Sequence, residues 1–224
     1  MHISVNFHTS CDKFHRTMSL YSSHGGENVK KFFSLTAAFC LVFSLTTCAR
    51  WREPEPDYLG MMLQAAQQGD LQAGHEAQEL YRLQAAEKGE TAEVSFDELY
   101  LLSRAIHYKY GHYRYSDELR MCAGEVILNR MASPEYPDSM EAVIFQPGQD
   151  TGIEPEDFEQ CTCPSQACVA VACRLLSGER MLEPDVVLES HCPDKNIYAM
   201  FCDSLLGNTY FFKSEHPELY KTGN

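Results

Sequence analysis

Hydrophobic residues recur at helical spacing along most of the chain after residue 57. Tyr58 to Gly89 contains two such runs separated by Gly69-Asp70, which predicts two short helices with Gly89 as a C-terminal cap. These helices hold few large apolar residues, so we interpret them as a helical preface to the main domain. Ser95 to Glu98 has the Ser-x-x-Glu spacing of a capping box, whose serine oxygen accepts from first-turn amides. We therefore expect a third helix to begin at Ser95.

The rest of the chain alternates helical patterns with one long polar loop and ends in two short strands. Helices are predicted at Ser116–Met131, Ser139–Phe145 and Ser165–Ser177, and the loop at Gln146–Cys163. β-Branched and aromatic residues predict strands at Val186–Glu189 and Asn208–Lys213. The predicted fold class is therefore α+β, mainly α-helical, with a short terminal β-hairpin or sheet.

The N-terminal segment has the features of an export signal. Lys30 and Lys31 precede Phe32–Thr47, sixteen residues without a charge. This run is shorter than the roughly 20 residues of a membrane span and fits a secretory signal peptide. The sequence Leu45-Thr46-Thr47-Cys48 resembles a bacterial lipobox, in which the cysteine is lipidated. We expect a bacterial, extracytoplasmic protein that is either secreted or tethered to the membrane through Cys48.

Composition and charge narrow the class of protein. The chain has 224 residues, 44% hydrophobic and 22% charged, which excludes wholly disordered, collagen-like and polytopic membrane proteins. Its formal net charge is −14, so it lacks the broad basic face of nucleic-acid-binding proteins, and we expect no nucleic-acid partner. We divide the chain into an N-terminal extension with signal peptide (1–48), a linker and helical preface (49–94), the main domain (95–220) and a tail (221–224).

Cysteines are frequent in the second half of the chain. Seven follow Cys48, and Cys161, Cys163, Cys168 and Cys173 lie close together in a spacing unlike that of zinc ribbons. Disulfides are the expected state in an exported protein, with buried free thiols and a metal site as alternatives. Because seven is odd, at least one thiol is unpaired within a monomer. Phosphate-loop and zinc-protease motifs are missing, so we predict no cofactor and assign no metal ligands.

Aromatic and basic residues alternate from His107 to Tyr115. The four tyrosines of this segment are candidates for lining a sugar-binding groove, because aromatic faces stack on carbohydrate rings. The alternative is a helix end with half-buried aromatic side chains. A metal site formed by His107 and His112 is a third interpretation.

Three motifs carry a resemblance to a known family, namely Val126-Ile127-Leu128-Asn129-Arg130, Ser133-Pro134-Glu135-Tyr136-Pro137-Asp138 and Val143-Ile144-Phe145-Gln146-Pro147-Gly148-Gln149. Over residues 95–220 the chain resembles the SleB and CwlJ family of cell wall hydrolases, the spore-cortex-lytic enzymes, in its clostridial branch. The resemblance implies a small lysozyme-like domain that cleaves the bond between N-acetylmuramic acid and N-acetylglucosamine, often as a lytic transglycosylase. It also implies peptidoglycan glycan strands as the partner, with Tyr108, Tyr110, Asn129 and Gln149 as substrate-binding residues.

The resemblance places a lysine where the family has its catalytic residue. The family's general acid is a glutamate within Ala-Glu-Ala at the end of the first core helix, and the aligned segment here reads Tyr108-Lys109-Tyr110. A lysine ammonium group is too weak an acid to protonate a glycosidic oxygen, so we expect the rate to fall roughly 10²- to 10⁴-fold. Glu125 and Glu118 of the next predicted helix are candidate substitutes. Asp150, where the family has an aromatic residue, is a second departure.

Two functional hypotheses follow from the sequence. The first is an exported peptidoglycan hydrolase homologue whose catalysis is impaired because Lys109 occupies the position of the general acid. The second is a non-catalytic module that binds peptidoglycan or another partner and keeps the groove without the acid. The sequence does not predict an oligomeric state.

Overall fold

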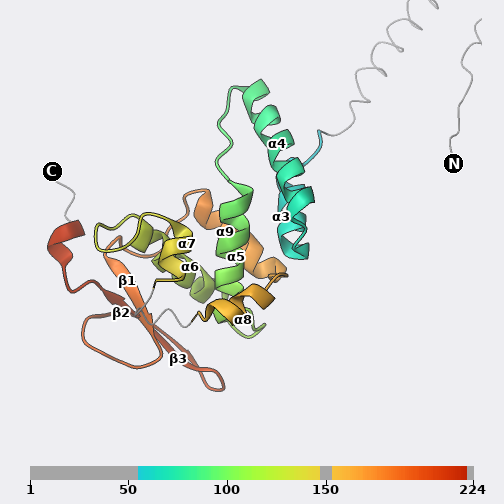
Figure 1. Cartoon of the computed structure of the whole chain (residues 1–224). Helices are drawn as coiled ribbons and strands as arrows, with labels where there is room; N and C mark the ends of the chain where they lie inside the picture. Colours follow the sequence, from blue (N-terminus) through green and yellow to red (C-terminus); the bar gives the residue numbers. More distant parts are fainter. Residues whose placement is uncertain (1–54, 147–152, 221–224) are drawn as a thin grey trace, which may run out of the picture. The chain divides into compact units, whose positions relative to one another are not determined.

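The computed structural model describes residues 55–146 and 153–220 (Figure 1). The predicted signal peptide, Cys48, Gln149 and Asp150 lie outside these residues. Residues Asp57–Asn224 form one compact unit of helices α3 to α9 and a small sheet, which confirms the α+β, mainly helical fold class. None of the helices in the described ranges is both long and apolar enough to cross a membrane.

The first two helices have the predicted bounds. Helix α3 (Tyr58–Gln68) and helix α4 (Leu71–Lys88) are joined at Gly69, whose φ of +69° belongs to the left-handed region that favours glycine. Gly89 caps α4 in the same conformation, as predicted. Met62, Ala65 and Ala66 of α3 are buried in the same core as α5 and α9. These two helices therefore share a core with the main domain, and the boundary at residue 94 stays a prediction.

Helix α5 (Phe96–Tyr110) begins without the predicted capping box. Ser95 is the N-cap residue, but its side chain makes no capping hydrogen bond. The amide of Phe96 instead donates to Oε1 of Gln78, a buried residue of α4, at 2.6 Å. The capping-box prediction is wrong because a side chain from the neighbouring helix supplies the acceptor that Ser95 was expected to supply.

Helix α6 (Asp117–Met131) packs against α5, α9 and β1. Ser116 caps it, accepting a hydrogen bond from the Leu119 amide at 3.2 Å. A Cβ atom at Gly124 would lie 2.6 Å from the end of the Leu175 side chain of α9 and 2.8 Å from that of Ile106 of α5, so a larger residue here would displace these side chains. The predicted helix at Ser116–Met131 is confirmed, and burial on almost every face explains the absence of a clear amphipathic stripe.

Three shorter helices complete the helical part. Helix α7 (Met140–Ile144) and helix α9 (Gln166–Leu176) confirm two predictions, and the hydroxyls of Ser139 and Ser165 cap them. Helix α8 (Pro155–Gln160) lies inside the segment predicted as loop. Its Pro155 has the fixed φ that suits a first helical position, and Phe158 is buried. The loop prediction is therefore wrong over these six residues.

A three-stranded antiparallel sheet lies beside α6, and a 3₁₀ turn (Pro217–Tyr220) follows it (Figure 1). Strand β3 (Gly207–Lys213) is central, between β1 (Val186–Ser190) and β2 (Ile197–Asp203). Val186 and Phe211 pack against the apolar residues of α6. The two predicted strands are confirmed, and β2 was missed because it is a largely exposed edge strand that begins directly after a polar loop.

The seven cysteines of the described residues are all free thiols. Cys122 and Cys168 are buried, whereas Cys163, Cys192 and Cys202 are exposed. The expectation of disulfides is therefore corrected for this part of the chain. The buried thiols occupy the core as small apolar groups, one in each of the helices α6 and α9.

Candidate functional site

The candidate site centres on an ion pair between the end of α5 and strand β1. Nζ of Lys109 lies 2.8 Å from Oε1 of Glu189. The two side chains are only 18% and 6% exposed, so water screens their charges weakly. The hydroxyl of Tyr110, the next residue of α5, donates to the same carboxylate oxygen. Glu189 thus accepts from two consecutive residues of the last helical turn.

The ion pair lines a small pocket of about 20 Å³ with otherwise largely apolar walls. Helix α6 contributes four positions at i, i+3, i+4 and i+7, namely Ala123, Val126, Ile127 and Arg130. Val143 and Ile144 of α7 form the facing wall. The pocket has room for about one water molecule. Its shape follows from the helical period of α6, which presents one face to the end of α5 and to β1.

Arg130 connects this pocket to a larger groove. Its Nε donates to the carbonyl of Val187 at 2.6 Å, and its guanidinium lies 5.2 Å from the ring centroid of Tyr136. The residue is 5% exposed, and burial lowers the pKa of its guanidinium. Arg130 and Glu189 also line a groove of about 500 Å³ beside β1 and β3, whose wall includes Phe212 and Lys195. Pocket and groove therefore meet at Arg130 and Glu189.

Two of the predicted substrate-binding residues have structural roles here. The ring of Tyr110 is fully buried, and burial together with the Glu189 carboxylate raises the pKa of its hydroxyl. Nδ2 of Asn129 donates to the carbonyls of Glu183 and Val186, both at 3.0 Å. The ring of Tyr110 and the amide donors of Asn129 are thus engaged within the protein, and their assignment to substrate binding stays a prediction. Tyr108 is half-buried against Phe158, with 6.1 Å between ring centroids.

Neither candidate substitute acid reaches the pocket. Glu125 is fully buried on the side of α6 away from it, where Oε2 accepts from the amides of Met181 at 2.7 Å and Leu182 at 3.1 Å. Burial raises the pKa of Glu125, and these two amides act in the opposite direction. Glu118 is exposed in the first turn of α6, and hydrogen bonds from its own amide and from Ser116 lower its pKa. Glu125 is thus a structural residue that joins α6 to the segment before β1.

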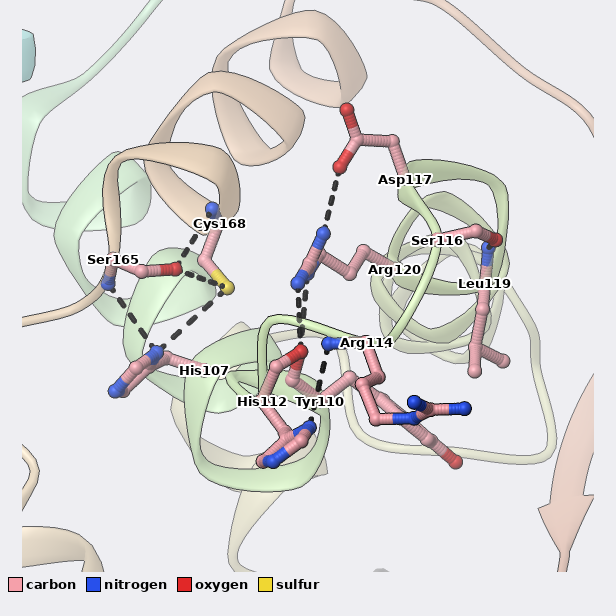
Figure 2. Close-up of polar contacts among 10 residues, drawn as sticks. All are labelled: His107, Tyr110, His112, Arg114, Ser116, Asp117, Leu119, Arg120, Ser165 and Cys168. Atoms are coloured by element: carbon pink, nitrogen blue, oxygen red, sulfur yellow. Dashed lines mark hydrogen bonds and ion pairs between the residues drawn. The ribbon is translucent and has the colours of Figure 1, made fainter. Parts of the chain in front are cut away.

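A polar cluster holds the end of α5 in place (Figure 2). Arg120 points from α6 toward this end, where its Nε and Nη2 donate to the carbonyls of Tyr110 and His112, each at 3.0 Å (Figure 2). On the other side, Nδ1 of His107 accepts from the Ser165 amide at 3.3 Å and lies 3.8 Å from Sγ of Cys168. The cluster fixes the helical turn that carries Lys109.

The surroundings of His107 and His112 bear on the interpretations of this segment. Burial lowers the pKa of His107, with a smaller contribution from the charge of Arg120. The described part of the chain contains no group of three or more histidine, cysteine, aspartate or glutamate side chains able to hold a metal ion. His112 lies instead against the rings of Tyr113 and Tyr115, at 4.5 and 6.3 Å between centroids. The segment is a helix end with partly buried aromatic residues, and its assignment to sugar binding stays a prediction.

Sequence reasoning missed Glu189 and Arg130 as site residues. Glu189 was predicted only as the end of a strand, and Arg130 only as part of a motif. The sequence did contain one signal for Glu189. It directly follows the apolar run Val186-Val187-Leu188, and an acidic side chain that continues a buried strand needs a polar partner. Its partner Lys109 lies far away in the sequence, and nothing in the local pattern joins the two.

Comparison with known proteins identifies the class to which this part of the chain is similar. Residues 116–189, about a third of the chain, match the family Cell Wall Hydrolase. The matched range contains Arg130 and Glu189 and begins after Lys109. No curated protein and no solved structure matches the chain. The SleB and CwlJ assignment, its clostridial branch and the lysozyme-like comparison therefore stay predictions.

Proposed function

We propose that this protein acts on peptidoglycan outside the cytoplasm, through a domain of the cell wall hydrolase type. The match of residues 116–189 to that family is the observation that carries this class of function. The predicted signal peptide supports an extracytoplasmic location, with Cys48 as the proposed lipid-modified residue in the tethered form. The groove of about 500 Å³ beside the Lys109–Glu189 pair is within the range of ligand-binding pockets.

We further propose that glycan cleavage by this domain is impaired. Cleavage of a glycosidic bond requires a group that gives a proton to the departing oxygen. The resemblance puts the family's glutamate at position 109, where this chain has a lysine. The carboxylate that does reach the pocket, Glu189, already contacts Lys109 and accepts a hydrogen bond from Tyr110. Oε1 of this carboxylate is therefore already engaged by two side chains of α5.

The alternative is a module that binds peptidoglycan without cutting it. The sizes of the two spaces favour it, because the pocket beside Lys109 and Glu189 holds about one water molecule while the adjoining groove has about 500 Å³. The two proposals differ only in residual activity. Both assign the groove to peptidoglycan.

A digestion experiment with a matched charge control tests these proposals. The purified protein, Lys109→Glu and Lys88→Glu are incubated with peptidoglycan, and soluble muropeptides are analysed by mass spectrometry. Lys109→Glu places two carboxylates side by side, and such a pair shares one proton, so one member becomes an acid. We expect products from Lys109→Glu only. Lys88→Glu changes the net charge equally at the end of α4, away from the pocket.

Sedimentation with intact peptidoglycan provides the second measurement. All three proteins are expected to cosediment with it, because the groove is the same in each. Equal release of muropeptides by the unmodified protein and by Lys109→Glu would contradict the impairment. Failure of all three proteins to cosediment would contradict the peptidoglycan function itself.

A further inference from the structure

The charges in the pocket do not cancel. Three charged side chains line it, those of Lys109, Arg130 and Glu189, which gives the pocket a formal charge of +1 in a chain of net charge −14. Lys109 and Glu189 form an ion pair with each other. Among the described residues, no carboxylate lies within ion-pair distance of Arg130. Within the described residues, the Glu189 carboxylate acts on the charge of Arg130 only from beyond ion-pair distance, and Lys109 already pairs with that carboxylate.

The guanidinium of Arg130 is held in place with donors to spare. Its Nε bonds to the Val187 carbonyl, and its plane lies near the Tyr136 ring. Neither Nη group donates to an acceptor within residues 55–146 or 153–220. The residue lines both the small pocket and the groove, so part of its side chain borders open space. A charge that is 5% exposed with unused donors is costly unless a partner binds there.

The position of Arg130 shows from where such a partner arrives. Arg130 lines both the small pocket and the groove beside β1 and β3. A ligand group in the groove reaches the guanidinium without entering the pocket. Planar guanidinium groups bind carboxylates through two parallel hydrogen bonds, which selects this anion by geometry as well as by charge.

We propose that Arg130 is the receptor for a carboxylate of a ligand that occupies the groove beside β1 and β3. The carboxylate site follows from the geometry of Arg130. Only the assignment of the carboxylate to peptidoglycan rests on the proposed function. Peptidoglycan offers two sources, the lactyl group of muramic acid and the acidic residues of its peptide stems. Glu189, the other residue shared by pocket and groove, opposes the incoming anion by its own negative charge. The groove is also lined by Asp194, Glu215 and Lys213. Its exposed Lys195 provides an internal comparison.

Binding measurements on the full chain test this proposal with three small probes. N-acetylmuramic acid carries the sugar carboxylate, L-alanyl-γ-D-glutamate carries the peptide carboxylates, and N-acetylglucosamine carries none. We expect one or both acidic probes to bind in calorimetric titrations, and N-acetylglucosamine to bind at least about tenfold more weakly. The acidic probe that binds identifies the source.

Variants separate a specific receptor from a diffuse positive charge. Arg130→Lys keeps the charge but loses the planar donor pair, so we expect affinity for the acidic probe to fall about tenfold. Lys195→Gln removes a solvated charge, and we expect less than about a twofold change. Glu189→Gln removes the opposing charge, and we expect affinity to rise about fivefold. A larger loss of affinity in Lys195→Gln than in Arg130→Lys would overturn the proposal.

Thermal unfolding of each variant checks that the fold is intact. Should Arg130→Lys unfold, because its bond to Val187 is lost, the probe comparison and Glu189→Gln decide the question. Equal binding of acidic and neutral probes, or unchanged affinity in Glu189→Gln, contradicts a carboxylate receptor. If the protein cosediments with peptidoglycan but does not bind the acidic probes, the carboxylate receptor is contradicted. The proposed peptidoglycan function is then still supported.

Discussion

Lys109 and Glu189 lie on different elements and meet at 2.8 Å in a largely buried site. One stands at the end of α5 and the other in β1, so the pair joins the helical part of the molecule to its sheet. Tyr110 strengthens the connection by donating to the same oxygen. The ion pair is therefore both the centre of the candidate site and a contact that holds two elements together.

Removal of the lysine alone is expected to destabilise the protein. Lys109→Met leaves Glu189 buried with no cation at ion-pair distance, which we expect to lower the free energy of unfolding by about 3 kcal/mol. The double variant Lys109→Met/Glu189→Gln removes both charges and is expected to recover most of that loss. Urea unfolding of the two variants and the unmodified protein measures the difference. A double variant as unstable as the single one would contradict this account.

Stability is expected to depend on pH through Glu125. Burial raises its pKa in the folded protein, so the folded state binds more protons than the unfolded state above the ordinary value of 4.5. The free energy of unfolding then falls as the pH rises from this value to the raised pKa, by about 1.4 kcal/mol for each unit of the shift. Glu125→Gln does not titrate, so its stability relative to the unmodified protein should rise over this interval.

Urea unfolding at several pH values between 4 and 8 measures this difference. Glu118→Gln serves as the control, because Glu118 is exposed and its pKa is lowered rather than raised. A difference between the unmodified protein and Glu125→Gln that stays constant with pH would show that Glu125 is not held in the protonated form.

Asn129 is expected to contribute to stability and not to ligand binding. Asn129→Ala removes two hydrogen bonds to carbonyls of the segment that leads into β1, at a cost of about 2 kcal/mol. Cosedimentation with peptidoglycan should be unchanged at temperatures where the variant is folded. Weaker cosedimentation by a variant of unchanged thermal stability would instead restore the role of Asn129 in binding.

Thiol reactivity should follow burial. Cys163, Cys192 and Cys202 are exposed and are expected to react with a maleimide reagent in the native protein. Burial raises the pKa of Cys122 to about 12 and also raises that of Cys168, so both should react only after unfolding. Mass spectrometry of proteolytic peptides assigns the labelled positions. Rapid native labelling of Cys122 or Cys168 would contradict the packing of α6 and α9.

Local sequence patterns predicted most of the helices because residues close to each helix end determine where the helix begins and ends. Gly69-Asp70 and the caps at Ser116, Ser139 and Ser165 act within a few residues of the helix ends that they define. The errors arose where distant residues decide the outcome. Gln78 replaces the predicted cap of α5, and α8 is too short to show a helical period.

The candidate site was predicted only in part for the same reason. Lys109 was identified through the resemblance, because an alignment with the family compares single positions of the sequence. Its partner Glu189 and the neighbouring Arg130 become recognisable only when α5, α6 and β1 are brought together. Glu125 was a candidate substitute acid, but α6 is buried on nearly all sides, so its sequence pattern does not indicate which side of the helix meets the pocket.

The order of strands in the sheet has a consequence for the boundaries of this protein as a folding unit. In the part of the chain that the structure describes, strand β1 pairs with β3, which lies after residue 189, and α6 packs against α5, which lies before residue 116. A fragment limited to residues 116–189 would keep the matched segment yet lack both of these neighbours and Lys109. The segment that matches the family is therefore shorter than the set of elements that pack together in this structure, and we expect the isolated fragment 116–189 not to fold.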